Sequence, residues 1–357
     1  RAALERTGVA PDDVDEVVMG EVGQAGDPYN ARRCALEAGL PVRVTAMNVN
    51  RLCGSGLQAI WSAAQSILTG QAEIVVAGGD ENMTRQPFMD LEARNGYRLG
   101  DRSLHDGALL LVTDPFSGLL MGATAECVAE RYGASREEQD RFALASQRKA
   151  AAAIEAGRFA DEIVPVQVTD GRKTQLIDQD EQPRPDSTLE ALAALRPVFK
   201  EGGTVTAGNS SAMNDAAAVV VVTSEAAANA RGLTPRLRLV EVAAAGNEPE
   251  LMGYAPTYAV RKLLAKVKMR PSDVDLVELN EAFAAQSVPV IRDAELDPER
   301  VNPNGGAIAL GHPVGATGCI LTIKAMHELR RRSAEYAIVS MCIGGGQALA
   351  ALFQNAG

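Results

Sequence analysis

The sequence has few aromatic residues, few histidines and no long apolar run. Aromatic side chains make up 4% of its 357 residues, and histidine occurs only at His105, His312 and His327. No apolar stretch reaches the roughly 18 residues that a membrane-spanning helix needs, so no membrane association is expected. Because His105 and His327 lie in polar surroundings, His312 is the candidate for any chemistry that requires an imidazole.

The chain also lacks an excess of positive charge and the cysteine patterns that mark disulfides or metal sites. Its 35 basic and 46 acidic residues give a formal net charge of −11, which argues against nucleic acid as a partner. The five cysteines form no CxxC pair and are too sparse for a disulfide framework. Cysteine and histidine show no metal-ligand spacing, so no metal is expected.

What the sequence does contain is mostly small and apolar. Apolar residues make up 46% of the chain, and Ala, Val, Leu and Gly dominate. This balance is typical of α/β proteins, in which small residues pack where helices meet sheets. A chain of 357 residues exceeds one simple core and can form two or three packed domains.

Three glycine-rich segments are candidate functional turns. Cys53 lies in Asn-Arg-Leu-Cys-Gly-Ser-Gly, His312 lies in a longer run with glycine on both sides, and Cys342 precedes three glycines. Glycine lets a backbone approach a ligand closely and direct N–H groups at it. A thiolate nucleophile and a developing oxyanion need this setting. Two cysteines and one histidine framed in this way suggest covalent acyl chemistry on sulfur.

The chain repeats itself at a nearly constant offset. Residues 1–21 align without a gap to residues 261–281, and a slightly larger offset pairs Gly56 with Gly318. In both halves the order is helix, Pro-Asp turn, apolar strand, glycine turn into a helix, then another apolar strand. The repeat therefore predicts a duplicated α/β domain.

A segment of different character separates the two halves. It is polar and helix-rich, with a capping box that starts a helix at Ser135 and with prolines at 183 and 185. We therefore predict a first half over residues 1–83, an inserted loop domain over residues 84–215 and a second half over residues 216–357. Two matching halves place the site at their junction, where the turns after corresponding strands converge.

The position of each candidate residue allows a functional or a structural interpretation. Cys53 precedes a helix predicted to begin at Gly56, and a helix N-terminus lowers the pKa of a thiol and favours the reactive thiolate. The second half carries Gly315 opposite Cys53, so the shared scaffold does not require a thiol there. Cys342 could instead be a core cysteine, and His312 could cap the helix that follows it.

Five motifs in order make almost the whole chain resemble the thiolase family. They are Cys-Gly-Ser-Gly at 53–56, Gly-Asn-Ser-Ser-Ala-Met-Asn-Asp at 208–215, Asn-Glu-Ala-Phe at 280–283, Asn-Gly-Gly-Ala-Ile-Ala-Leu-Gly-His-Pro at 304–313 and Cys-Ile-Gly-Gly-Gly at 342–346. The resemblance implies an α/β fold of two similar halves in α-β-α-β-α layers, with an inserted loop domain. It also implies that the chain lacks roughly the first 35 residues of that fold, including the opening strand of the first half.

The resemblance implies a catalytic role for five residues. Cys53 would be the acylated nucleophile, His312 the base that activates it, and Cys342 the group that moves the α-proton of the second substrate. Asn280, through a water, and His312 would line one oxyanion hole. The backbone N–H groups of Cys53 and Gly344 would line the other.

The resemblance also implies a coenzyme A site. Ser211 would meet the pantetheine arm, and Arg184 would lie near the nucleotide phosphates, where an acidic protein needs local positive charge. The acyl and pantetheine groups would be bordered by Met121, Phe283, Leu120 and Phe199.

We therefore expect an acetyl-CoA acetyltransferase, which condenses two acetyl-CoA to acetoacetyl-CoA and CoA and also catalyses the reverse thiolysis. A broader-chain 3-ketoacyl-CoA thiolase is the nearest alternative, because Leu120 stands where short-chain enzymes commonly have histidine. A decarboxylating ketoacyl synthase fits less well, since its site has histidine or asparagine where Cys342 stands. A non-catalytic acyl-CoA-binding protein on this scaffold is the alternative of another class, and the retained Cys53, His312, Cys342 and Asn280 argue against it.

The same reasoning sets the expected partners and location. Acyl-CoA and CoA are the expected ligands, used as substrates, and no cofactor, nucleic acid or membrane is expected. We expect a homodimer or a homotetramer. The expected location is the cytoplasm, and an organellar leader would fall in the part of the fold that the chain is expected to lack.

Overall fold

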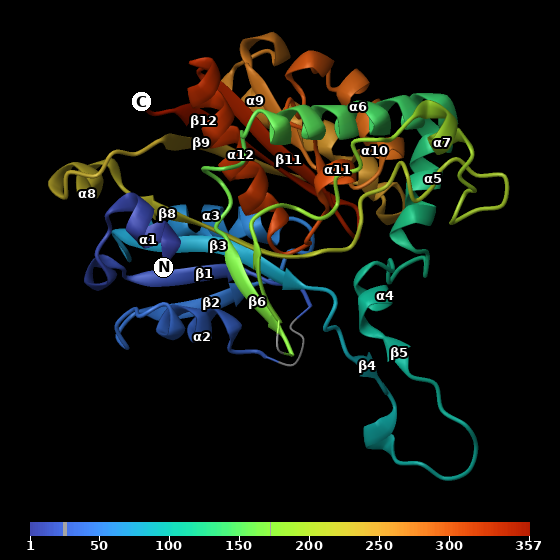
Figure 1. Ribbon diagram of the computed structural model, residues 1–357, viewed down its shortest axis with the longest axis horizontal. Coiled ribbons are helices and arrows are strands. Elements are labelled where there is room, and N and C mark those ends of the chain that lie inside the picture. The colour runs from blue at the N-terminus through green and yellow to red at the C-terminus, as the bar shows by residue number, and fades with distance from the viewer. Residues whose placement is uncertain (24–26, 172) are drawn as a thin grey trace.

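The fold consists of two four-stranded sheets with helices between and outside them (Figure 1). The computed structural model describes residues 1–23, 27–171 and 173–357. The first sheet has the order β2-β1-β3-β8, in which β1 pairs in parallel with β2 and β3, and β8 pairs antiparallel with β3. Its strands are β1 (Glu16–Gly20), β2 (Thr45–Val49), β3 (Ile74–Asn82) and β8 (Asp215–Thr223).

The second sheet has the order β10-β11-β12-β9. Strand β10 is parallel to β11, and β12 is antiparallel to both β11 and β9. Its strands are β9 (Leu237–Gly246), β10 (Leu276–Leu279), β11 (Tyr336–Ile343) and β12 (Gln347–Asn355). The two candidate cysteine motifs thus belong to different sheets, because Cys53 follows β2 and Cys342 lies in β11.

Helices α3 (Ser55–Leu68) and α12 (Thr317–Arg332) form the layer between the two sheets (Figure 1). Helix α3 packs on β1 and β3, α12 packs on β10 and β11, and the two helices contact each other. Glycine allows this contact: a Cβ on Gly56 would lie 2.8 Å from the Cys319 backbone nitrogen, and one on Gly318 would lie 2.2 Å from that of Leu57. The two glycines that the sequence repeat pairs therefore mark the point where the halves meet.

The outer layers complete the predicted α-β-α-β-α order. Helices α1 (Ala2–Thr7) and α2 (Asn30–Glu37) cover the outer face of the first sheet, and α9 (Ala255–Val267) covers the second. Along β1, Val17 packs with the outer helices while Val18 packs with α3, as the two-residue period of a strand requires. The remaining helices that follow β8 in the chain are α8 (Glu225–Ala230), α10 (Ala284–Asp293) and α11 (Ala307–Leu310).

The sequence repeat has a direct structural counterpart at two identical aspartates. Asp15 Oδ2 accepts from the backbone N–H groups of Glu73 and Ile74, at 2.7 and 3.0 Å. Asp275 Oδ2 accepts in the same way from Glu335 and Tyr336, at 2.9 and 3.0 Å. Each aspartate thus ties the start of its own strand to the start of the neighbouring strand. Strand pairing therefore explains why this residue recurs in both halves.

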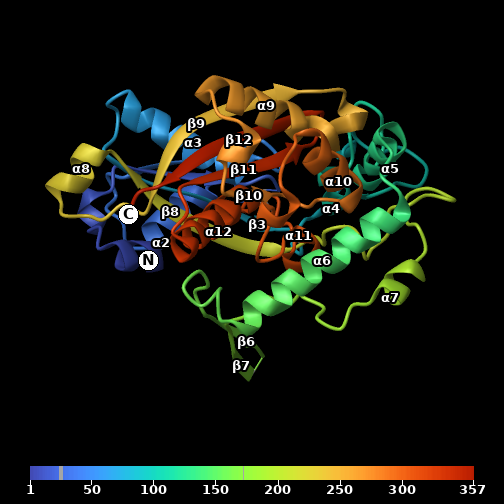
Figure 2. The same cartoon turned by 90° about the horizontal axis from the view of Figure 1, so that it is seen from above.

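The segment between β3 and β8 lies on the outside of this core (Figures 1 and 2). It contains β4 (Phe88–Met89), β5 (His105–Asp106), α4 (Gly107–Leu111), α5 (Met121–Tyr132), α6 (Arg136–Glu155), β6 (Val166–Asp170), β7 (Lys173–Ile177) and α7 (Leu189–Ala193). Ser135 forms the predicted capping box at the start of α6, which lies along α10 and α11. Neither α6 nor any other helix in the described ranges is long and apolar enough to cross a membrane.

The structure differs from the sequence interpretation at one boundary. We assigned residues 216–357 to the second half, but β8 pairs with β3 along its whole length and completes the first sheet. The first half therefore resumes after the insert, because a strand belongs to the sheet that satisfies its backbone hydrogen bonds. The limits of the inserted loop domain, 84–215, stay a prediction.

Candidate active site

The Cys53 loop is a tight turn that leads into α3. Its backbone is held by Ser55, whose hydroxyl donates to the Leu52 carbonyl at 2.7 Å and accepts from the Arg51 N–H at 2.8 Å. Leu52 has a φ of 49°, which is costly for a bulky side chain. Such strain persists where surrounding contacts fix the backbone. Here the strained residue, Leu52, directly precedes Cys53. Gly54 keeps the turn against β11, since a Cβ there would lie 2.5 Å from Ile343 Cδ1.

The pKa of the Cys53 thiol is raised, not lowered as its place before a helix predicted. Burial raises it to about 11, and hydrogen bonds from the backbone N–H groups of Gly344 and Cys53 oppose that rise. Desolvation therefore outweighs the helix N-terminus in the resting protein. The consequence is that Cys53 needs a base to become a thiolate at neutral pH.

His312 lies in the turn between α11 and α12 and is only 8% exposed. Its Nδ1 is 2.6 Å from Thr317 Oγ1, and its Nε2 is 3.4 Å from Asn280 Nδ2. The Thr317 hydroxyl donates to the Pro313 carbonyl at 2.8 Å, so it accepts from His312 and assigns the ring proton to Nδ1. Burial lowers the pKa of His312 to about 4. The imidazole is therefore neutral near pH 7, and its Nε2 lone pair, which faces the Asn280 amide nitrogen, can take a proton.

Replacing Thr317 by valine is expected to lower kcat about tenfold. The change leaves the buried Nδ1–H of His312 without an acceptor, which costs about 1–3 kcal/mol and allows the other tautomer, in which Nε2 is no longer a base. Thr317→Ser should retain activity because it keeps the hydroxyl. Steady-state rates for the three proteins test this, and equal rates for the valine and serine variants would contradict it.

Asn280 follows β10 and is fully buried. Its Oδ1 has no hydrogen-bond partner in the part of the chain that the structure describes, and its amide nitrogen lies near the His312 ring. A buried polar atom without a protein partner is a favourable place for an ordered water. The arrangement thus fits the predicted pairing of Asn280, through a water, with His312.

Cys342 is fully buried near the end of β11. It packs in a small apolar cluster with Met252 and Ala282, and Met121 and Phe283 border this cluster. Burial raises the pKa of its thiol, and the neighbouring charge of Cys53 raises it further. The structure therefore brings the two sulfurs together from the two halves of the chain.

Gly344 presents its backbone N–H group near Cys53 and Cys342. That N–H lowers the pKa of the Cys53 thiol, and a Cβ on Gly344 would lie 3.2 Å from Leu52 Cδ1 and 3.7 Å from Met121 Sδ. The glycine thus fits between the nucleophile loop and α5. This position is compatible with the predicted oxyanion hole, which the backbone N–H groups of Gly344 and Cys53 would line.

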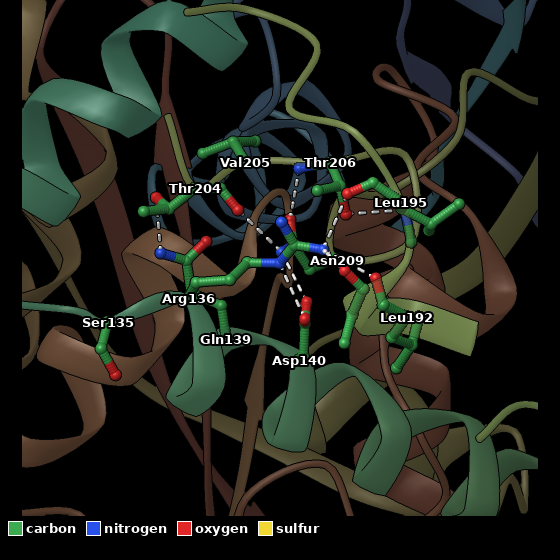
Figure 3. A network of polar contacts seen from close by, with 12 residues as sticks. Ser135, Arg136, Gln139, Asp140, Leu192, Leu195, Thr204, Val205, Thr206 and Asn209 are labelled. Atoms are coloured by element: carbon green, nitrogen blue, oxygen red, sulfur yellow. Dashed lines mark hydrogen bonds and ion pairs between the residues drawn. The ribbon is translucent and has the colours of Figure 1, made fainter. Parts of the chain in front are cut away.

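The loop that carries Ser211 is anchored on α6 (Figure 3). Asn209 Oδ1 accepts from Thr206 N at 2.8 Å, and its amide donates to Asp140 Oδ1 at 2.9 Å. Asp140 also accepts from Arg136, whose guanidinium reaches the Leu192 carbonyl at 2.7 Å. Beyond this network, Ser211 N donates to the Ala282 carbonyl at 3.0 Å. The network thus holds Ser211 beside the Asn280–Phe283 motif.

The predicted acyl-side residues also gather here. Phe199 and Phe283 meet edge to face with ring centroids 6.3 Å apart, and Phe199 lies directly against Gly122, which follows Met121. Leu120 caps the start of α5 and is 37% exposed. Arg184 is exposed in the loop before α7, where its backbone N–H donates to Gln147 Oε1 at 2.8 Å.

Three residues near the site were missed by the sequence reasoning. Leu52 and Met252 are ordinary apolar residues whose contact with Gly344 or Cys342 appears only after folding. Thr317 lies five residues after His312, at the start of the helix predicted there, so its place could have indicated contact with the histidine. Within the described ranges, no group of three or more histidine, cysteine or acidic residues is arranged to hold a metal.

Comparison with known proteins decides the family. Residues 1–226 match the family model described as the N-terminal domain of thiolase, and residues 233–355 match the C-terminal domain of thiolase. The chain belongs to the thiolase family. The acyltransferase class and the fold class predicted from the motifs are thereby confirmed.

Relatives with near-complete coverage agree with this placement. The chain is 51% identical over 359 residues to the beta-ketothiolase BktB of Cupriavidus necator, covering 99% of this thiolase and 91% of the relative. The Bacillus anthracis acetyl-CoA acetyltransferase structure superposes with a TM-score of 0.97 at 45% identity, over 99% of this chain and 90% of the other. A human mitochondrial 3-ketoacyl-CoA thiolase in complex with CoA gives 0.96 at 44% identity, over 99% and 89%.

Proposed function

We propose that this thiolase is an acetyl-CoA acetyltransferase, which joins two acetyl-CoA into acetoacetyl-CoA and CoA and also catalyses the reverse thiolysis. The observation that carries the proposal is the meeting of two sulfurs, Cys53 and Cys342, beside the Gly344 N–H, with Asn280 and His312 paired in the same junction. The names of its relatives support acetyl-CoA and 3-ketoacyl-CoA as the substrate class. The reaction uses thioesters as substrates and no cofactor.

The first step transfers an acetyl group to Cys53. His312 Nε2 takes the thiol proton, the thiolate attacks the acetyl-CoA carbonyl, and the C–S bond to CoA breaks. The CoA thiolate leaves with the proton that His312 held, so charge is balanced. The N–H groups of Gly344 and Cys53 stabilise the oxyanion formed on the way.

The second step makes the carbon–carbon bond. Cys342, as its thiolate, removes an α-proton from the second acetyl-CoA, and the resulting carbanion attacks the acetyl group on Cys53. The C–S bond to Cys53 breaks, and the departing Cys53 thiolate takes back the proton that Cys342 received. The enolate oxygen accepts a hydrogen bond from a water on Asn280, beside His312. A thiolate at Cys53 would oppose ionisation of Cys342. Acetylated Cys53 cannot ionise, so it places no charge beside Cys342 in this step.

Mass spectrometry after incubation with acetyl-CoA tests the proposal. An acetyl group on Cys53, together with CoA-dependent cleavage of acetoacetyl-CoA, is the expected result. Acetyl on Cys342 alone would contradict the division of roles. Tight CoA binding without either activity would support the non-catalytic alternative instead.

The acyl chain length is proposed from the pocket wall. Leu120 stands half-exposed beside Met121, and a leucine offers no hydrogen bond to a polar 3-keto thioester. This observation favours a weaker preference for four-carbon substrates than a histidine at the same place would give. A broader-chain 3-ketoacyl-CoA thiolase is therefore the second candidate.

Leu120→His is expected to shift kcat/KM toward acetoacetyl-CoA. One methylene in an apolar pocket is worth about 1–3 kcal/mol, so the shift relative to six- to ten-carbon 3-ketoacyl-CoA should be tens-fold. Steady-state thiolysis of both substrates measures it, with Leu119→His as the neighbouring control. A wild-type protein that already rejects six-carbon substrates more than about a thousandfold would contradict this role.

Arg184→Ala is expected to raise KM for CoA substrates severalfold and to leave kcat nearly unchanged. Its exposed guanidinium can meet a nucleotide phosphate and contributes equally in ground and transition states. The comparison belongs at low ionic strength, because salt screens exposed charges. Arg238→Ala, which removes an exposed arginine of β9, is the matched control. An unchanged KM at low salt would show that Arg184 does not contact the nucleotide and is an ordinary solvated side chain.

A homodimer or homotetramer is also part of the proposal. The arm that holds β4 and β5 extends from the body (Figure 1), and it exposes Phe88, Leu91, Tyr97, Leu99 and Leu104. Apolar side chains gathered on a projecting segment favour burial against another subunit. Action in the cytoplasm on CoA and acyl-CoA completes the proposal, with no nucleic acid or membrane partner.

A further inference from the structure

The segment that carries His312 is held at its C-terminal end by a buried carboxylate of the first half. Glu81, at the end of β3, is 3% exposed. Its oxygens accept from the backbone N–H groups of Gly23 at 2.9 Å, Gly315 at 3.0 Å and Val22 at 3.3 Å. Gly315 lies three residues after His312, so one carboxylate joins the turn of the catalytic histidine to the other half of the chain.

A second buried carboxylate holds the N-terminal end of the same segment. Glu281, next to Asn280, is 2% exposed and accepts from Asn302 Nδ2 at 2.7 Å, Ser146 Oγ at 2.6 Å and Ile308 N at 3.3 Å. Ser146 Oγ also accepts from Gly306 N at 3.0 Å. The start of α11 is thereby fixed to β10 on one side and to α6 on the other (Figure 2).

Both ends of this segment pack closely against their neighbours. A Cβ on Gly306 would lie 2.2 Å from Glu281 Cδ, and one on Gly315 would lie 2.4 Å from the Asp80 carbonyl. Each glutamate receives three hydrogen bonds, and an ionised carboxylate can accept all three without presenting a donor of its own. Burial raises the pKa of both groups, while these hydrogen bonds oppose the rise. The contacts thus suit two charged acceptors.

We propose that Glu81 and Glu281 are paired positioning residues for His312, which fix the backbone of residues 306–315 from the two halves of the molecule. The inference rests on the proposed function, in which His312 activates Cys53. Neither carboxylate contacts the predicted reacting atoms. Their effect is to keep Nε2 of His312 aligned with Asn280 and with the nucleophile loop, which Val314 contacts two residues further on.

Glu81→Gln and Glu281→Gln are expected to lower kcat by about 10- to 100-fold, because a shift of about 1 Å at a reacting group has an effect of this size. The amide places an NH2 group against N–H donors, so one hydrogen bond becomes a repulsive contact. KM for acetoacetyl-CoA should change less than about threefold. Ser146→Ala is the milder second variant, which keeps both carboxylates and should reduce kcat less than Glu281→Gln does.

Glu278→Gln is the matched control. Glu278 lies on β10, two residues before Asn280, and is as buried as the two positioning residues. Within the described part of the chain its carboxylate makes no hydrogen bond to residues 306–315, and burial raises its pKa to about 8, so it is mostly protonated at pH 7 and the amide resembles it. Its kcat should equal that of the wild type. A loss equal to that of Glu81→Gln would overturn the proposal, because any buried carboxylate would then have the same effect.

The deciding measurement is the single-turnover rate of Cys53 acetylation by acetyl-CoA, followed by mass spectrometry. Each glutamine variant should lower this rate in the wild-type background and should not lower it further in the His312→Ala background. Equal losses in both backgrounds, or a rise in KM with unchanged kcat, would overturn the positioning role. If His312→Ala itself leaves acetylation at the wild-type rate, the proposed function fails and not only this inference. If a glutamine variant does not fold, Ser146→Ala in both backgrounds gives the same test at the Glu281 end.

Discussion

Replacing Cys53 by alanine is expected to reduce acetyl transfer and thiolysis by at least about 10⁴-fold while CoA binding persists. In the proposed mechanism the Cys53 thiol forms the covalent bond that divides the reaction into two steps, while Cys342 lies in the apolar cluster with Met252 and Ala282. Removing a nucleophile has a far larger effect than removing one hydrogen bond, because the covalent pathway itself is lost.

The fold should survive this change. The turn at Cys53 is held by Ser55 and by the backbone, and neither contact uses the thiol. A thermal unfolding curve and CoA binding by calorimetry should therefore match the wild type within experimental error. Cys127→Ala, which removes a half-buried cysteine of α5, is the control and should keep full activity. Residual turnover above one part in a hundred in the Cys53 variant would show that another group carries the acyl chain.

Cys342→Ser is expected to lower both condensation and thiolysis by about 10²–10⁴-fold and to leave acetylation of Cys53 intact. A hydroxyl is a much weaker acid than a thiol, so the serine cannot take the α-proton of the second substrate near neutral pH. In the proposed mechanism the first step does not use Cys342, because His312 activates Cys53 and the Gly344 N–H stabilises the oxyanion. The two cysteine variants therefore separate the two steps.

Single-turnover acetylation combined with steady-state thiolysis makes this comparison. The serine variant should accumulate the acetyl group on Cys53, while Cys53→Ala should not acquire one at any residue. Cys319→Ala, a buried cysteine in α12, serves as a control for removing a buried sulfur. If Cys342→Ser cannot be acetylated at all, Cys342 acts in the first step as well, and the assignment of the α-proton to it is wrong.

Much of this site could be predicted from the sequence because glycine marks positions where the backbone needs an unusual conformation or a close approach. The turns at Cys53 and His312, and the glycine turn that follows Cys342 at the end of β11, need close approach or unusual backbone angles, and only a few residue types satisfy these needs. The repeated aspartates, Asp15 and Asp275, likewise make the same contact in each half. Motif, repeat and layer order thus follow from short-range requirements, and the structure bears out the turns, the repeat and the layers.

The charge states of the site could not be predicted in this way. The place of Cys53 before a helix predicted a lowered thiol pKa, yet burial raises it to about 11. Burial depends on segments that are distant along the chain, such as the loop of Gly344 and the helix that begins at Met121. A pKa is therefore a property of the assembled site, and no local pattern carries it.

By itself, the sequence determined which residue types stand in the turns, where the halves repeat and which chemistry those turns can support. Only the tertiary structure decided that β8 completes the first sheet, that Thr317 assigns the His312 proton to Nδ1 and that Glu81 and Glu281 hold the histidine from two sides. Each of these facts joins residues that are distant in the chain or lie on different elements. Hydrogen-bond partners and desolvation exist only once the two halves pack together, and the catalytic alignment depends on that packing.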